Sequence, residues 1–306
     1  MLSANATVRA DLAANAEPGV LPVAKRDWTW WLGAAISVGI LVAALYQLRL
    51  VNLAEVSAMV PASPLFWLAF AGAYFIGPAG DWLIFRRLWS IPAAGFVALT
   101  RKMIGNELLL GYIGEVYFYT WARRRTHMTS APFGAIKDVA ILSALTGNAI
   151  TLAMLALAFP LIGSLEFGIQ PSTLLGSVAV VLVTSSALLF FGKRIFSLPR
   201  HELWITSGIH LARILIYAGL SALAWHLVLP QVALSWWILL SASRQLLSRL
   251  PLMPNKDIVF AGLAVFLIGH DAEIGALMTM MASLTLITHI GLGLLLSAGE
   301  AVRFKR

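Results

Sequence analysis

The sequence has no cysteine and very little charge, and both absences narrow the range of functions. Without cysteine, a disulfide, a thiolate nucleophile and a cysteine-ligated metal site are all excluded. Only 12% of the 306 residues are charged, about half the fraction of a typical soluble domain, whereas 59% are hydrophobic. The motifs His-Glu-x-x-His and Gly-x-Ser-x-Gly and a glycine-rich phosphate loop are also missing. The composition therefore predicts a polytopic membrane protein without a metal or cofactor.

Long uncharged windows reach the roughly 20 residues that a bilayer helix needs. They predict six full spans, at residues 29–49, 64–86, 137–161, 173–192, 204–229 and 273–298. The net charge of +8 comes from lysine and arginine, which gather between alternate spans as expected for cytoplasmic loops, so nucleic acid is not an expected partner. This pattern places both termini in the cytoplasm, with a disordered tail at residues 1–27 and a basic tail at residues 301–306.

The stretch "GNELLLGYIGEVYFYTWARRR" at residues 105–125 is apolar, yet basic residues flank it on both sides. Arg101 and Lys102 precede it and an arginine triplet ends it, so a single crossing would leave one basic group outside. A hairpin that enters and leaves on the cytoplasmic side avoids this. Glycine permits the backbone break at residues 111–114, and the freed backbone groups must then lie inside the protein. We therefore predict a re-entrant hairpin with an apolar part at residues 103–121.

The second half contains a related segment at residues 232–273. Two short apolar pieces, at about 232–243 and 258–269, flank a basic middle. They form either a second re-entrant hairpin or two short crossings with the middle in the cytoplasm. Internal similarity favours the hairpin, because "APFGAIKDVAILSALTGN" (131–148) aligns without a gap with "AEIGALMTMMASLTLITH" (272–289).

Inverted repeats with interrupted helices are typical of transporters. The predicted fold is therefore an all-α polytopic membrane protein with about six full transmembrane helices and two re-entrant helical hairpins. Residues 28–165 form the first membrane repeat and residues 166–300 form the second, which is inverted relative to the first.

Charged and polar residues deep in apolar segments are rare and usually functional. Glu115 lies just after the glycine break. It either meets a cationic headgroup, pairs with an arginine or takes up a proton, or it only pins the hairpin through a salt bridge. Asn106 either touches a ligand or fixes the re-entrant backbone. Arg213 lies about ten residues inside a predicted span, too deep to reach the interface easily, and is expected to be functional or to pair with Asp81 or Asp257.

The candidate substrate-binding residues are Asn106, Glu115, Arg123, Arg124, Arg213, Arg249 and Asp257. Guanidinium groups match phosphate bidentately, so the arginines are expected to meet phosphate, and the two carboxylates to meet cationic groups. For the arginine triplet, topology and surface-lipid contact are an equal alternative. Asp81 has Arg86 or Arg87 as alternative partners. His226 and His289 are expected to bond a nearby hydroxyl or carbonyl.

The segment "NELLLGYIGEVYFYTWARRR", followed by "APFGAIKDVAILSAL", resembles the lysylphosphatidylglycerol synthase transmembrane family, also called the flippase-like membrane domain. The shared features are Asn106, the Leu-Leu pair at 108–109, the Gly-Glu pair at 114–115 and the basic run at 123–125. The resemblance would cover most of residues 28–300. The second half departs from the pattern at "PLMPNKDIVF", where the expected glycines are missing and Asp257 stands in for a glutamate.

This resemblance implies a lipid flippase-like transporter of the bacterial inner membrane. Its expected partners are membrane lipids, either an anionic or aminoacylated phospholipid or a polyprenyl-linked lipid. Because the chain ends at Arg306, the resemblance implies transport without a synthase domain. The alternatives from other classes are a membrane-embedded enzyme that modifies a lipid headgroup, and a membrane scaffold that transports nothing.

Overall fold

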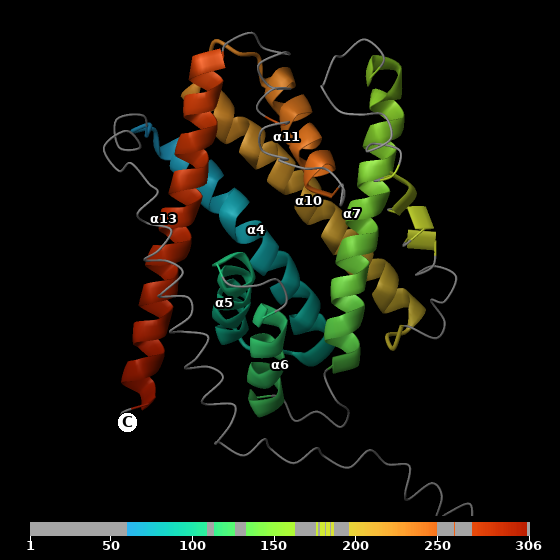
Figure 1. Cartoon of the computed structure of the whole chain (residues 1–306). Coiled ribbons are helices and arrows are strands. Elements are labelled where there is room, and N and C mark those ends of the chain that lie inside the picture. Colours follow the sequence, from blue (N-terminus) through green and yellow to red (C-terminus); the bar gives the residue numbers. More distant parts are fainter. Residues whose placement is uncertain are drawn as a thin grey trace, which may run out of the picture.

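Figure 1 shows the computed structural model, and its regular structure is helical throughout the residues that it describes. These are residues 60–108, 113–125, 133–162, 196–249 and 271–304, together with 176, 178–180, 182, 183, 185, 186 and 260. The helices are α4 (Pro64–Trp89), α5 (Ala94–Leu108), α6 (Ile113–Arg125), α7 (Phe133–Ile162), α10 (Arg200–Val228), α11 (Leu234–Arg249) and α13 (Asp271–Phe304).

Four helices within this described part are long and apolar enough to cross a bilayer. The qualifying segments are Pro64–Trp89, Gly134–Ala153, Arg200–Val228 and Glu273–Leu296. They coincide with four of the six predicted spans, and they identify a helical multi-pass membrane protein. The predicted span at 29–49 lies outside the described residues, and the span at 173–192 is described only at a few helical positions.

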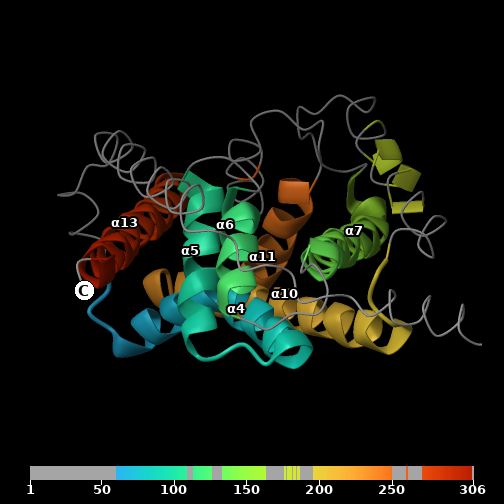
Figure 2. The same cartoon turned by 90° about the horizontal axis from the view of Figure 1, so that it is seen from below.

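Helices α4 and α10 run antiparallel and form the axis on which the other helices pack. Proline begins α4 at its first position, where no intrahelical N–H bond is lost. The helix ends at Ser90, which adopts the left-handed conformation (φ 51°) and donates its N–H to the Arg86 carbonyl at 2.8 Å. Figure 2 shows α5, α6 and α11 above this pair, with α13 and α7 on opposite flanks.

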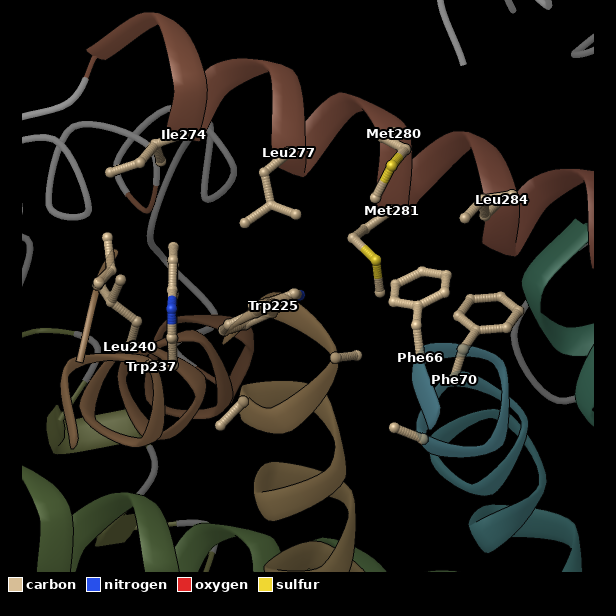
Figure 3. Packing of buried hydrophobic residues seen from close by; sticks show 14 of the residues in the cluster. Phe66, Phe70, Trp225, Trp237, Leu240, Ile274, Leu277, Met280, Met281 and Leu284 are labelled. Atoms are coloured by element: carbon tan, nitrogen blue, oxygen red, sulfur yellow. The ribbon is translucent and has the colours of Figure 1, made fainter. Parts of the chain in front are cut away.

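An apolar cluster fills one end of this pair, where α4 begins and α10 ends. Its fully buried side chains come from α4, α10, α11 and α13, and they include Phe66, Trp225, Trp237, Leu277 and Met280. Figure 3 shows α13 laying leucine and methionine side chains over the aromatic rings of the other helices. Lipid offers an apolar surface as good as leucine, so this end is held together mainly by close packing rather than by exclusion of water.

Helices α5 and α6, which cover the first predicted hairpin, lie side by side in Figures 1 and 2, and their re-entrant course stays a prediction. The first arm begins at Ala94, earlier than predicted, so Arg101 and Lys102 lie within the arm and not before it. Arg101 is buried, with its guanidinium carbon 5.0 Å from the ring centre of Tyr117. Burial against an aromatic ring explains why this cation need not sit in a loop.

In the second half, α11 extends to Arg249, beyond the predicted apolar piece at 232–243. The second predicted piece, at 258–269, lies outside the described residues except for Phe260, which is helical and buried. Phe260 packs on Trp225, and the guanidinium of Arg244 lies 5.6 Å from its ring centre. The choice between a hairpin and two short crossings therefore stays a prediction.

The helix ends that carry the basic residues gather at one end of the molecule. Arg87, at the end of α4, binds Glu202 at the start of α10 through two hydrogen bonds of 2.8 and 3.1 Å. Gly134, at the start of α7, lies against Ser197, which precedes α10. The C-terminal end of α13 lies at the same lower end in Figure 1. This arrangement agrees with the common side that the positive charges predict for these ends.

Candidate functional site

Four charged side chains from four helices meet in the interior at the middle of the α4–α10 pair. Arg213 of α10 donates from Nη1 to Asp81 Oδ1 of α4 at 2.7 Å. Lys102 of α5 donates from Nζ to the other oxygen, Asp81 Oδ2, at 2.9 Å. The same ammonium group lies 3.4 Å from Glu115 Oε1 of α6. These four residues, Asp81, Lys102, Glu115 and Arg213, form what we call the charged cluster.

A fifth helix contributes a hydroxyl to this arrangement. Ser143 of α7 accepts a hydrogen bond from Arg213 Nη2 at 2.6 Å, so the two terminal nitrogens of one guanidinium join α4 and α7. Gly80 makes room for the arginine, since a β-carbon at this position would lie 3.1 Å from Arg213 Cδ. The stem of Arg213 can therefore lie directly against α4 while its head reaches the carboxylate.

The two arms of the hairpin are joined by the carboxamide of Asn106. Its Oδ1 accepts the backbone N–H of Gly114 at 2.7 Å, and its Nδ2 donates to both oxygens of Glu115, at 3.2 and 3.0 Å. The first bond satisfies one of the amide groups that a helix leaves free at its N-terminus. One side chain thus caps α6 and holds Glu115 toward Lys102.

Gly114 allows the two arms to approach this closely. A β-carbon at Gly114 would collide with the backbone carbonyl oxygen of Lys102, which cannot move aside as a flexible side chain can. Gly105 on the facing arm lies next to Gly114, and a β-carbon there would be 3.8 Å from the Gly114 α-carbon. Gly105 and Gly114 therefore allow the two arms to pack closely.

The charged cluster is balanced in charge and only partly shielded. It contains two cations and two carboxylates, and their side chains are between 13% and 19% exposed. The ammonium group of Lys102 lies 2.9 Å from Asp81 and 3.4 Å from Glu115, so two carboxylates compensate for the burial of its charge. Lys102 is therefore held as a cation, available to bind oxygen anions.

The structure brings together three of the predicted site residues, Asn106, Glu115 and Arg213, around the charged cluster. For Arg213 it selects Asp81 from the two partners that the sequence offered. Arg123 lies with its guanidinium carbon 5.7 Å from the ring centre of Tyr119, and Arg124 is exposed near the end of α6. Arg249 is the last residue of α11, and Asp257 lies outside the described residues.

Lys102 and Ser143 belong to the site although they were not among the predicted site residues. Lys102 counted only as a topology signal, although it lies four residues before Asn106 and thus on the same face of a helix. Ser143 carried no signal, because a serine in an apolar helix is common. Asp81 was expected to pair with Arg213 or with a neighbouring arginine; Arg87 instead binds Glu202.

The single histidines bond as the sequence predicted. His226 Nδ1 lies 2.8 Å from the Val232 carbonyl, which ties the turn between α10 and α11. His289 Nδ1 lies 2.6 Å from the Tyr74 hydroxyl and joins α13 to α4. His210, one turn before Arg213, has its Nε2 3.1 Å from the Val139 carbonyl of α7. These contacts are structural links between helices.

Within the described residues, no group of three or more histidine, aspartate or glutamate side chains could hold a metal ion. The comparisons with known proteins add no assignment: no family model matches the chain, and neither a curated protein nor a solved structure is similar to it. The features that bear on function are therefore the charged cluster, the paired helices α5 and α6, and the membrane architecture.

Proposed function

We propose that the protein is a lipid transporter of the flippase type, which moves the headgroup of a phospholipid or polyprenyl-linked lipid past the charged cluster while the chains stay in the bilayer. The observation that carries this proposal is the meeting of four charged side chains inside an apolar multi-pass protein. Ionisable groups at such positions are costly in a membrane and typically mark a transport path. Apolar side chains of the same size would often stabilise a protein equally well.

The arrangement of the helices supports transport as well. The bounds of α4, α5 and α7 recur in α10, α11 and α13 about 140 residues later, as an internal repeat would require. The first such pair, α4 and α10, runs antiparallel and meets at Asp81 and Arg213. Transporters built from inverted repeats bind substrate at the interface between the repeats, close to the middle of the membrane.

The chemistry of the charged cluster suits a phosphate-bearing headgroup. Anionic phospholipids, aminoacylated phospholipids and polyprenyl-linked lipids all carry phosphate, and Lys102 and Arg213 offer donors for its oxygens. Glu115 provides a carboxylate for a cationic part of the headgroup. We place the protein in the bacterial inner membrane with both termini in the cytoplasm, and we assign the driving force to protons or to the membrane potential.

One observation favours a second candidate, a membrane scaffold that transports nothing. Glu115 and Arg213 both have partners inside the protein, so the charged cluster already balances itself. In that case it would only fix how the helices pack. The other alternative, an enzyme that modifies headgroups, needs a nucleophile or metal ligands beside Glu115, whose described partners are Asn106 and Lys102.

The test is reconstitution into vesicles with fluorescent lipids of three headgroup classes: phosphatidylglycerol, an aminoacylated phosphatidylglycerol and a polyprenyl phosphate. Movement between leaflets is followed by adding a membrane-impermeant quencher. We expect the wild-type protein to move at least one of these lipids faster than protein-free vesicles do. Lys102→Gln and Arg213→Gln should abolish the movement.

Matched controls come from cations outside the charged cluster. Arg86→Gln and Arg87→Gln each remove one arginine charge and should keep the wild-type rate, since both side chains are exposed. All variants are compared at equal monodispersity in detergent, so that loss of folding is recognised. A wild-type protein that moves none of these lipids would leave the scaffold as the better candidate. Full activity in Arg213→Gln would show that transport does not depend on the charged cluster.

A further inference from the structure

Asp81 occupies a place that is built to bind an anion. Its two oxygens are divided between two cations from different helices, Arg213 at 2.7 Å and Lys102 at 2.9 Å. Both cations are held from behind: Ser143 accepts from the far nitrogen of Arg213, and Glu115 lies 3.4 Å from the ammonium of Lys102. The two donors are therefore fixed at the separation that two oxygens of one anionic group require.

From this juxtaposition of Lys102, Arg213 and Asp81, and resting on the transport function proposed above, we infer that Asp81 is a resident counter-ion and that a phosphodiester monoanion replaces it when substrate binds. A phosphodiester presents two equivalent oxygens, as a carboxylate does, and it carries one negative charge. With Asp81 neutral, the charged cluster has two cations against one carboxylate, Glu115. This net charge of plus one is neutralised by the single negative charge of the incoming phosphodiester.

The exchange links anion binding to a proton. A carboxylate that loses both of its cations in a partly buried site is strongly disfavoured in its charged form. Asp81 therefore takes up one proton from solvent when the phosphodiester takes its place, and it returns that proton when the anion leaves. Charge balances on each side of the exchange, because one anion and one proton enter together.

Other titratable groups face Asp81 and must be separated from it. Lys102 approaches from α5, with Glu115 of α6 behind it, and Arg213 approaches from α10. His210, also on α10, is close enough to act on Asp81 electrostatically. On α7, Ser143 does not titrate, and Asp138 is engaged elsewhere by the backbone N–H groups of Ser197 and Leu198, at 2.6 and 2.8 Å. His210 is thus the group whose titration a pH experiment must exclude.

The experiment measures equilibrium binding to the purified full-length protein in detergent between about pH 5 and pH 8. Three probes are used: dihexanoyl phosphatidylglycerol, the chain-free diester glycerophosphoglycerol, and inorganic phosphate. For the wild-type protein, affinity for the phosphodiester should rise by about tenfold for each unit that pH falls, as uptake of one proton requires. Asp81→Asn should bind the diester at least as tightly at high pH as the wild type does at low pH, without this slope.

His210→Gln is the matched control and should keep the wild-type slope. If Asp81→Asn does not fold, proton uptake by the wild type decides instead, measured calorimetrically in buffers of different ionisation enthalpy. Tighter binding of the lipid than of the chain-free diester assigns the site to headgroups, whereas equal binding of inorganic phosphate assigns it to free anions.

Affinity that does not change with pH, or a slope that disappears in His210→Gln and persists in Asp81→Asn, would overturn the role of Asp81. Binding of none of the three probes would overturn the anion site. Equilibrium binding is measured independently of transport. Binding without lipid movement would therefore reject the proposed transport function but keep the anion site. Lipid movement without linked proton uptake would reject the exchange alone.

Discussion

The apolar cluster at the start of α4 and the charged cluster at the middle of the α4–α10 pair are built on different principles. Where α4 begins, Phe66 and Trp225 pack with α11 and α13 into a cluster of hydrophobic side chains. At the middle of the pair, the same two helices bring Asp81 and Arg213 together, and α5 and α6 add Lys102 and Glu115. The apolar end can tolerate small changes in side-chain volume. In the charged middle, the loss of any one side chain leaves another charge without its partner. Function is therefore sought in the charged middle and stability in the apolar end.

The largest effect is expected from Asp81→Ala, which leaves Lys102 and Arg213 without their shared carboxylate. Removing one partner of a buried ion pair costs about 3–5 kcal/mol, because the remaining charge is no longer compensated. We expect a loss near that range in the free energy of unfolding, measured by denaturation in mixed micelles. The double variant Asp81→Ala with Arg213→Met should lose less than the sum of the two single variants. Additive losses would mean that the two charges do not act on each other.

The next effect concerns the hairpin that carries Lys102 and Glu115. Gly114→Ala places a methyl group against the Lys102 carbonyl oxygen, so the arms must separate, and overpacking of this kind costs about 3 kcal/mol at its upper range. Gly77→Ala is the control, because a β-carbon there meets nothing within 4 Å. The control should unfold at the wild-type denaturant concentration or slightly above it. Equal behaviour of the two variants would show that the arms are not closely packed.

The apolar end should respond less sharply. Leu277→Ala, in a side chain that is 1% exposed, leaves a cavity between α13 and the aromatic rings and should cost about 2 kcal/mol in the free energy of unfolding. Leu295→Ala makes the same change on the same helix at a position that is 69% exposed, and it should cost little. Lipid movement should survive in both variants at temperatures where they remain folded. Loss of transport in a folded Leu277→Ala protein would show that the apolar end also takes part in function.

The sequence predicts the helical membrane architecture well, because uncharged windows and basic loops follow directly from the cost of placing charge in lipid. It also predicts Arg213 as a deep cation with a carboxylate partner, which the structure identifies as Asp81. It could not place Lys102 in the site, because a lysine beside an arginine is typical of a cytoplasmic loop. Its role depends on Asp81 of α4, which only the packed helices bring next to it. Nor could the sequence decide whether Asn106 contacts a ligand or caps the second helix of the hairpin. That distinction depends on the position of the Gly114 amide, which only the packed hairpin defines.

The smallest effect is expected at the second ion pair between the same two helices. Arg87 and Glu202 form a good bidentate pair at 2.8 and 3.1 Å, yet the Arg87 side chain is 46% exposed, whereas those of Asp81 and Arg213 are 13% and 18% exposed. In an exposed pair, water and salt replace most of the interaction, so many such pairs contribute nothing measurable. Arg87→Gln should therefore leave both the unfolding midpoint and the rate of lipid movement unchanged at physiological salt. A loss as large as that of Asp81→Ala would show that this helix end is shielded from water. Burial, and not the number of hydrogen bonds, decides which of the two pairs the protein depends on.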